Sequence, residues 1–411
     1  MRCVYRTACL VCLASVVAGC VPLPVSTVAL HQRTERPVAL TSAATVNGGS
    51  FIAPAFDASG DLLAVYDSGS DRILILRSAD LAPLRTLQAT RRPRRLGFSP
   101  GGHYLIVEAH AGWIEDHLRG KPATGTVDIH SPAAVRDAVQ RAEIWKLETA
   151  ERVLDFACDA VVASEPKGGW LWARNRAITP GYRSSPLLAV FFSGDESEFS
   201  ALCWNGVRQR WNGRTWQRLD DIPPPGSWSR AAGLGSAYYW DRRQAQPRRL
   251  PGRCAPTLQP VFTVSADGSR MAVVCGKGLG HALHVWDLAA SSEIPLQGTE
   301  FGLARGGPLI RESGLALSSD GRYLAAALLE LAEALVVTPI PAPLGVSRSD
   351  LRLWDVATGK ELAAVPIDDL IASADYFRGV DLAISPDNAK LAVAGVRLRI
   401  YRMSDLGAGP R

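Results

Sequence analysis

A short phrase of apolar and aromatic residues recurs along the chain. Residues 351–365 read LRLWDVATGKELAAV, and residues 283–296 and 142–156 carry the related phrases LHVWDLAASSEIPL and AEIWKLETAERVLDF. Each phrase has two short stretches of alternating residues on either side of a turn, which indicates β-strands rather than helices. A chain that repeats one unit in this way folds into units that pack against one another.

The full unit has a front half and a back half. The back half occurs at residues 73–81, 142–156, 207–219, 236–250, 283–296, 351–365 and 398–406. A front half, two apolar stretches around a turn such as Asp-Gly, occurs at residues 56–65, 98–107, 192–202, 264–273, 317–327 and 384–393. Gly and Asn accept the positive φ of tight hairpin turns, so each half predicts a hairpin and each unit four antiparallel strands. Only the fourth unit, around residues 224–235, lacks a clear front half.

The repeat dictates how the sheets pack. One such sheet has two apolar faces, and stacking the sheets around an axis buries both faces and leaves only short edges. We therefore predict an all-β fold, a seven-bladed β-propeller of four-stranded antiparallel blades over residues 36–406, with the recurrent Trp as a wedge between blades. Residues 158–187 could add an eighth blade, and a β-sandwich pair or an open solenoid is the competing architecture. The last unit lacks a full fourth strand, so an N-terminal strand at Arg36–Thr41 is predicted to close the last blade.

The two halves resemble the repeats of WD-repeat β-propellers. The similarity is carried by SSDGRYLA at residues 318–325 and by RLWDVATGKEL at residues 352–362, with a second strong copy at residues 264–296. No Gly-His pair precedes the units, and the turn Asp that organises regular WD blades is mostly absent. The resemblance therefore implies a looser, bacterial WD-like propeller.

The N-terminus has the pattern of an export signal. Arg2 and Arg6 precede an apolar run, Thr7–Val17, that is too short to span a bilayer, because spanning takes about 20 apolar residues. The run ends in Val-Ala-Gly-Cys at residues 17–20, which resembles the lipobox of bacterial lipoproteins. A plain secretory signal is the alternative.

The lipobox resemblance implies a mature protein that starts at a lipidated cysteine. Residues 1–19 would be the signal peptide, cleavage would fall between Gly19 and Cys20, and residues 20–35 would be a lipidated tether. Several acyl chains on Cys20 would hold the protein stably at the membrane, where one chain would not. Val21 follows the cysteine instead of Asp, which favours the outer membrane and a location facing the periplasm.

Charge and cysteine content agree with an exported globular protein. The formal net charge of +5 falls by two when Arg2 and Arg6 leave with the signal, which argues against a general polyanion binder and against nucleic acid as a partner. Four cysteines remain beyond Cys20, namely Cys158, Cys203, Cys254 and Cys275. In an oxidising compartment they permit disulfides in three pairings, and buried unpaired thiols are equally compatible with the sequence.

Three insertions interrupt the repeat, at residues 109–141, 158–187 and 333–349. Each falls between the second and third strands of a unit or between successive units, and these connections share one face of a propeller. Loops on a rigid scaffold commonly carry binding residues, and Trp and Arg are typical interface anchors. The candidate partner-binding residues are therefore Trp113, Trp170, Trp172, Arg174 and Arg176. The alternative is padding that covers the mouth of the channel.

A second stretch, residues 208–253, holds ten Arg against three Asp, with four Trp between them. We interpret it as a solvated outer rim, with an anionic envelope partner as the alternative.

The sequence contains no motif that predicts catalysis. G-x-S-x-G and C-x-x-C-H are absent beyond residue 20, and the spacing of the His residues does not indicate a metal site. We therefore expect no metal or cofactor and a non-enzymatic envelope lipoprotein that serves as a protein–protein interaction platform. The alternative function is a propeller that binds or processes a glycan or small cofactor at its axial channel.

Overall fold

The computed structural model describes residues 42–109, 141–158, 160–162, 182–184, 187–203, 206–223, 238–241, 246–249, 261–277, 280–301, 314–331, 346–371 and 380–407. In these ranges the regular elements are β-strands and two 3-10 turns, η4 (Asp368–Leu370) and η5 (Met403–Leu406). The fold is all-β, as predicted.

The strands form six antiparallel sheets, which we number I to VI. Sheet I contains β2 (Phe51–Phe56), β3 (Leu62–Asp67), β4 (Arg72–Arg77) and β5 (Pro83–Gln88). Sheet II contains β6 (Pro93–Phe98), β7 (Tyr104–Ala109), β8 (Arg141–Lys146) and β9 (Glu151–Ala157). Sheet III contains β12 (Leu187–Phe192), β13 (Glu198–Cys203), β14 (Arg208–Asn212) and β15 (Arg218–Ile222).

The second half of the chain repeats this order. Sheet IV contains β18 (Val261–Val264), β19 (Arg270–Lys277), β20 (Gly280–Asp287) and β21 (Ser292–Ile294), with β22 (Glu300–Phe301) also paired to β20. Sheet V contains β23 (Leu315–Leu317), β24 (Tyr323–Leu331), β25 (Val346–Asp355) and β26 (Lys360–Pro366). Sheet VI contains β27 (Asp381–Ile384), β28 (Lys390–Ala394), β29 (Leu398–Arg402) and β1 (Ala44–Val46). Two hairpins complete the strands, β10 (Ala160–Val162) with β11 (Tyr182–Ser184), and β16 (Tyr238–Asp241) with β17 (Gln246–Arg249).

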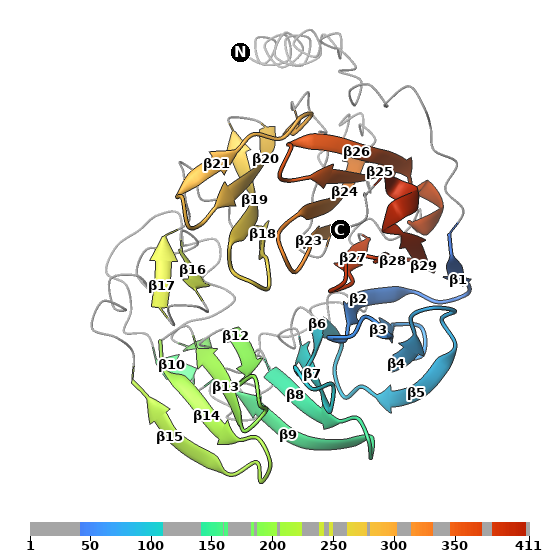
Figure 1. The fold of residues 1–411 in the computed structure, drawn as a ribbon. Helices are drawn as coiled ribbons and strands as arrows, with labels where there is room; N and C mark the ends of the chain where they lie inside the picture. Colours follow the sequence, from blue (N-terminus) through green and yellow to red (C-terminus); the bar gives the residue numbers. More distant parts are fainter. Residues whose placement is uncertain are drawn as a thin grey trace, which may run out of the picture.

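The sheets are arranged in a ring around one axis, which makes the molecule a β-propeller (Figure 1). The first strand of each sheet is innermost, and β2 contacts both β6 and β27. The β16–β17 hairpin lies in the ring between sheets III and IV. Seven blades stays a prediction, since residues 224–237 and 250–260, on either side of this hairpin, lie outside the described part of the chain.

The N-terminus closes the ring, but with a later segment than predicted. β1 pairs with β29 in antiparallel register, from Ala44 opposite Ile400 to Val46 opposite Leu398. The closing strand is therefore Ala44–Val46 instead of Arg36–Thr41, and residues 36–41 lie outside the described residues. Ala44 and Val46 pack against the core between sheets VI and I, which explains why this segment supplies the fourth strand.

Each described junction between neighbouring sheets has its own apolar core. Separate clusters join sheets I and II, II and III, IV and V, V and VI, and VI and I. The strand alternation places one set of side chains toward the preceding sheet and the other set toward the following sheet. Sheets I, II, V and VI thereby have both faces buried, which is the physical reason for the repeat.

The recurrent Trp occupies one register position in successive sheets. Trp145, Trp211, Trp286 and Trp354 lie in the third strand, opposite Leu105, Phe199, Met271 and Leu324 in that order. Trp145, Trp211 and Trp354 are buried between sheets, whereas Trp286 is partly buried. The interpretation of the Trp as a wedge agrees with these positions.

The front-half turns share one hydrogen-bond pattern. In five sheets a Ser hydroxyl accepts the backbone N–H five residues later, at Ser99, Ser193, Ser265, Ser318 and Ser385. In sheet I a carboxylate oxygen of Asp57 takes the same bond from Leu62. The residue three positions after each of these acceptors has a positive φ, and it is Gly in four turns but Glu196 and Asn388 in the others. The Ser-x-Asp-Gly pattern is therefore a turn motif with a structural role.

Candidate interaction surface

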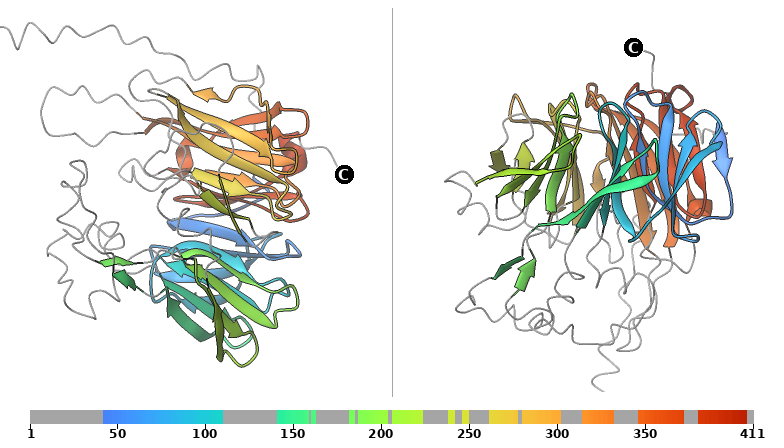
Figure 2. Two further views of the ribbon diagram at one scale, coloured as in Figure 1. Left: turned by 90° about the vertical axis from the view of Figure 1, so that its left-hand side faces the viewer. Right: turned by 90° about the horizontal axis from the view of Figure 1, so that it is seen from below.

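The insertions leave the ring at one face. β7 ends at Ala109 and β8 begins at Arg141, while β24 ends at Leu331 and β25 begins at Val346. These are the connections between second and third strands, on the same side as the chain that links sheet II to sheet III. We call this side the loop face. It lies opposite the C-terminal end of the described chain, and β10–β11 stands on it (Figure 2).

The predicted insertion boundaries need correction at four places, because residues 109, 141, 187 and 346–349 belong to strands β7, β8, β12 and β25. The third insertion therefore ends at residue 345. The stretch at 158–187 contains the two-stranded β10–β11 pair, in which Ala160 faces Ser184 across the ladder. The predicted partner-binding residues Trp113, Trp170, Trp172, Arg174 and Arg176 lie outside the described residues, as do Gly19 and Cys20.

A disulfide joins sheets II and III at the loop face. Cys158 follows β9 of sheet II and is bonded to Cys203, the last residue of β13 in sheet III. Both residues are buried in the core between the two sheets. The sequence left three pairings open, because only the adjacency of these two strand ends selects a partner. The bond fixes the position at which the 158–187 segment leaves the ring.

Two hairpins extend beyond their sheets toward the loop face. β24 and β25 pair from Tyr323–Asp355 to Leu331–Val346, although β23 covers only the first part of this ladder. β19 and β20 pair as far as Lys277 opposite Gly280. Asp369 in η4 forms ion pairs with Arg397 and Arg399 of sheet VI at the same face. These ion pairs therefore connect sheet V to sheet VI at the loop face.

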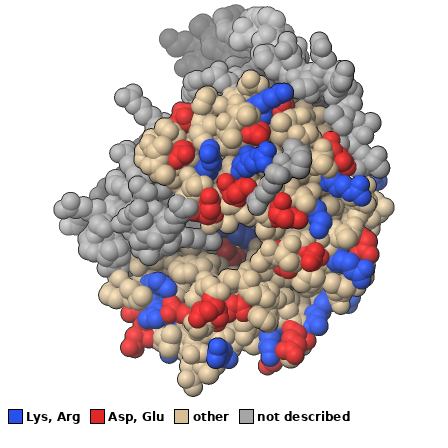
Figure 3. Space-filling view, in the orientation of Figure 1, with Lys and Arg blue, Asp and Glu red and all other residues tan. Residues whose placement is uncertain are grey.

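The opposite face is a set of interlocked turns. Asn388 of sheet VI donates a hydrogen bond of 2.8 Å from its amide to Asp320 of sheet V. Lys390 donates from Nζ to the carbonyl of Gly60 in sheet I, at 3.0 Å. Acidic and basic side chains are interspersed on this face, which is hollowed near the axis (Figure 3). Short, cross-linked turns leave little room for large ligand-induced movement here.

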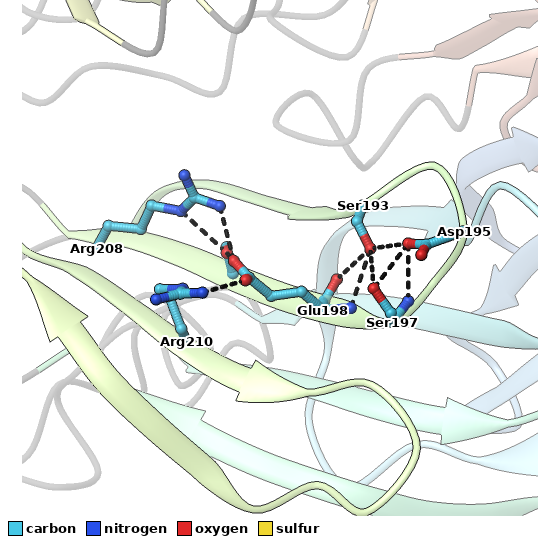
Figure 4. Close-up of polar contacts among 7 residues, drawn as sticks. Ser193, Asp195, Ser197, Glu198, Arg208 and Arg210 are labelled. Atoms are coloured by element: carbon cyan, nitrogen blue, oxygen red, sulfur yellow. Dashed lines mark hydrogen bonds and ion pairs between the residues drawn. The ribbon is translucent and has the colours of Figure 1, made fainter.

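Sheet III carries a charged cluster on the face that points away from sheet II. Glu198 accepts hydrogen bonds from Nη2 of Arg208 at 2.8 Å and Nη2 of Arg210 at 2.5 Å (Figure 4). Ser200 donates to Glu198 at 2.8 Å and accepts from Nε of Arg208 at 3.0 Å. The Arg208 guanidinium also lies over the ring of Phe191, 5.1 Å from its centroid. We call these five residues the sheet III cluster.

The hydrogen bonds and charges of this cluster set its protonation. Hydrogen bonding to Arg210 is the largest cause that lowers the pKa of Glu198 to about 2, with further lowering by Ser200 and by the charge of Arg208. The nearby turn carboxylate, Asp195, has its pKa lowered to about 2 by hydrogen bonds from Ser193 and Ser197. Glu198 is therefore ionised at neutral pH and balances one of the two guanidinium charges.

Sequence reasoning placed Arg208 and Arg210 in an Arg-rich outer rim and missed this cluster. The signal was present in the alignment of the repeats. The partner of Arg210 across the ladder is Ser200, and the same pair is Ala64–Ile75, Ile106–Ile144, Ala272–Val285, Ala325–Leu353 and Ala392–Ile400 in the other sheets. Two Arg in register with aliphatic residues mark an exceptional sheet face.

The described residues contain no cluster of three or more metal-ligating side chains. In the same part of the chain, no helix has the length and apolarity needed to cross a membrane.

No protein-family model matches the sequence, and a search of the curated proteins finds no match. Among solved structures, the chain is similar to the β-propeller domain of Cps50 (Swd1) from Myceliophteria thermophila, with 14% sequence identity and a TM-score of 0.40. The alignment covers 88% of this chain and 99% of that domain. The propeller assignment depends on the sheet order and ring closure described above.

Proposed function

We propose that this protein is an envelope lipoprotein whose propeller serves as a platform for protein–protein interaction through the loop face. The observation that carries the proposal is that every insertion into the repeat leaves the ring on one side. The ring itself is rigid, with an apolar core at each described sheet junction and cross-linked turns on the far side. Loops on such a scaffold can be displayed to a partner without an ordering cost in the scaffold.

The proposed location follows from the N-terminal sequence. Cys20 would carry the lipid, and residues 20–35 would link the anchor to the ring, with the outer membrane as the favoured site and the periplasm as the compartment. The Cys158–Cys203 bond supports this, since structural disulfides persist in exported proteins and are rare in the cytosol.

Replacing the first insertion tests the platform. Ala109 and Arg141 end and begin adjacent strands, so residues 110–140 can be replaced by Asn-Gly, which makes a two-residue hairpin. We expect normal thermal unfolding and loss of the protein partner that is recovered from wild-type membranes after mild crosslinking. The control inserts a segment of about 30 residues into the β4–β5 turn on the opposite face, which should leave recovery unchanged. If the partner is recovered equally with the Asn-Gly variant and with the wild type, the proposal is contradicted.

Fractionation tests the anchor separately. Cys20→Ala should release the protein into the soluble periplasmic fraction, because the acyl acceptor is gone. Cys254→Ala is the matched control and should stay with the membrane. Membrane retention of the Cys20→Ala protein, with the mass expected for an unmodified chain, would overturn the anchor.

A further inference from the structure

A buried carboxylate lies in the junction between sheets I and II. The side chain of Glu143, in β8, is 1% exposed. It is two residues before Trp145 and is therefore on the same side of the strand, and Trp145 packs in one core with Ile73 and Leu87 of sheet I. β8 begins at Arg141, so Glu143 lies close to the point at which the chain returns from the first insertion.

Glu143 has weak partners for a buried charge. One carboxylate oxygen accepts a hydrogen bond of 3.0 Å from Nε1 of Trp145, and the other lies 3.4 Å from Nη1 of Arg152. The guanidinium of Arg152 is 38% exposed and also contacts Asp155, at 3.5 Å, and the hydroxyl of Thr90 in the chain that links sheet I to sheet II. A carboxylate loses its water on burial, and one long contact with a shared guanidinium replaces little of it.

The corresponding Trp of sheet V is bound differently. Nε1 of Trp354 donates to the carbonyl of Gln297, in the chain that links sheet IV to sheet V. Arg352, in register with Glu143, donates to the next carbonyl of that chain, at Gly298. In sheet II the carboxylate of Glu143 takes the bond of the indole, which therefore stays within one sheet instead of joining two. In the other described sheets this register position holds Leu74, Gln209, His284, Arg352 and Arg399.

The groups that face Glu143 come from both sheets. On β9 these are Arg152 and Asp155, whose charges act on it. Sheet I contributes Tyr66 to the same core, and the hydroxyl of this residue is hydrogen-bonded within sheet I. The chain that links the two sheets carries two Arg, at residues 91 and 92, which have interactions of their own. The counter-charge of ionised Glu143 is thus a guanidinium that it shares with Asp155.

Burial is the largest influence on the protonation of Glu143. It raises the pKa above the ordinary value of 4.5, and the charge of Asp155 adds to the effect, whereas Trp145 and Arg152 lower the pKa without cancelling it. A group whose folded-state pKa is raised stabilises the fold while it is protonated, below its ordinary pKa. This contribution is lost as the pH rises through the raised value.

We propose that Glu143 makes the junction between sheets I and II sensitive to pH, firmer when its carboxyl group is protonated and weaker when it is ionised. Protonation removes a buried charge and leaves Arg152 to pair with Asp155. β8 receives the chain from the first insertion, so the proton on Glu143 determines how firmly the base of that insertion is held against sheet I. The inference depends neither on the lipid anchor nor on a protein partner.

Glu143→Gln tests the proposal, because the amide has the shape of the protonated carboxyl group and its oxygen can still accept from Trp145. At pH 7 we expect the variant to melt about 1–3 °C above the wild type. The difference should disappear well below pH 4.5, where Glu143 is protonated in the folded and the unfolded chain. The matched control is Glu148→Gln, which replaces an 81% exposed carboxylate in the turn between β8 and β9 and should melt with the wild type at either pH.

Two further measurements examine the charge itself. Arg152→Met leaves ionised Glu143 without its counter-charge, so it should lower the melting temperature at pH 7 strongly in the wild type and much less in the Glu143→Gln background. In a carboxyl-carbon NMR titration, the signal that Glu143→Gln lacks should titrate above pH 4.5 in the wild type. The proposal is overturned if this signal titrates at or below pH 4.5, if Glu143→Gln melts at or below the wild type at pH 7, or if Arg152→Met has the same effect in both backgrounds.

Discussion

The carboxylate of Glu196, in the front turn of sheet III, accepts a hydrogen bond of 2.6 Å from the backbone N–H of Gly101 in the corresponding turn of sheet II. Its other oxygen lies 2.7 Å from Nδ1 of His103. Glu196 has a φ of 56°, at the position where four other turns have Gly. A side chain is thus kept in a backbone conformation that disfavours it, and that side chain joins two sheets.

Glu196→Gln should therefore weaken the ring in a pH-dependent way. Burial alone would raise the pKa of Glu196, but hydrogen bonds from Ser99, His103 and Gly101 outweigh burial and lower it. A lowered folded-state pKa adds stability above the ordinary carboxyl pKa of 4.5, and this is lost as the pH falls through the lowered value. We expect the variant to lose about 1 kcal/mol in urea unfolding at pH 7 and to approach the wild type as the pH falls through the lowered pKa of Glu196. A deficit that is constant with pH would show that the charge is not involved.

The two Trp residues of sheets IV and V allow a matched comparison. Nε1 of Trp354 donates a hydrogen bond of 2.9 Å to the carbonyl of Gln297, whereas Nε1 of Trp286 is buried without a partner among the described residues. Trp354→Phe should cost about 1–3 kcal/mol of unfolding free energy, because it leaves a carbonyl unpaired and a gap in the core. Trp286→Phe should cost less than about 1 kcal/mol. Thermal unfolding of both variants measures the difference, and equal losses would contradict the assigned role of the hydrogen bond.

The disulfide gives a third prediction. Cys158 and Cys203 are 45 residues apart in sequence, and the bond limits the unfolded chain over that span. Cys158→Ala/Cys203→Ala should lower the unfolding free energy by about 2–4 kcal/mol. Reductant should lower the wild type to a similar value and leave the double variant unchanged. If reductant destabilises both proteins equally, the effect does not come from this bond.

The repeat predicted the sheets because hairpin turns and strand periodicity are local. Asp-Gly in residues 264–273 and Trp354 in residues 351–365 stand in the expected turn and strand. The closing strand was predicted at the wrong residues because its partner, β29, is far away in the chain. The stretches at 36–41 and 44–46 are both short and apolar, and only the pairing of Val46 with Leu398 distinguishes them.

Neither the sheet III cluster nor the disulfide was predicted from the sequence, because both depend on how the strands align with one another. Arg208 and Arg210 were interpreted by composition, whereas their meaning depends on register, which places them on the face that is apolar in the other sheets. The choice of Cys203 as partner for Cys158 depends on two strand ends meeting at one face. Side-by-side packing of sheets, not local sequence, determines both.

β1 closes the ring by pairing with β29, and a substitution can test how much this pairing contributes to stability. Replacing Ala44–Val46 with Gly-Ser-Gly removes strand propensity and the apolar contacts of Ala44 and Val46 with the core between sheets VI and I. The unpaired edge of β29 would then be exposed, and exposed edges pair with other chains. We expect a loss of about 1–3 kcal/mol in unfolding free energy and concentration-dependent self-association in sedimentation velocity.

The matched control replaces Asp220–Ile222, three exposed residues at the outer edge of sheet III, with the same Gly-Ser-Gly. This strand covers an outer edge as β1 does, but it does not join the two ends of the chain. Its loss should cost less and should leave the protein monomeric, because the ring stays closed. Equal destabilisation and equal self-association of the two variants would mean that β1 is only an edge strand, and that the cores between sheets VI and I and between V and VI hold the ring closed without it.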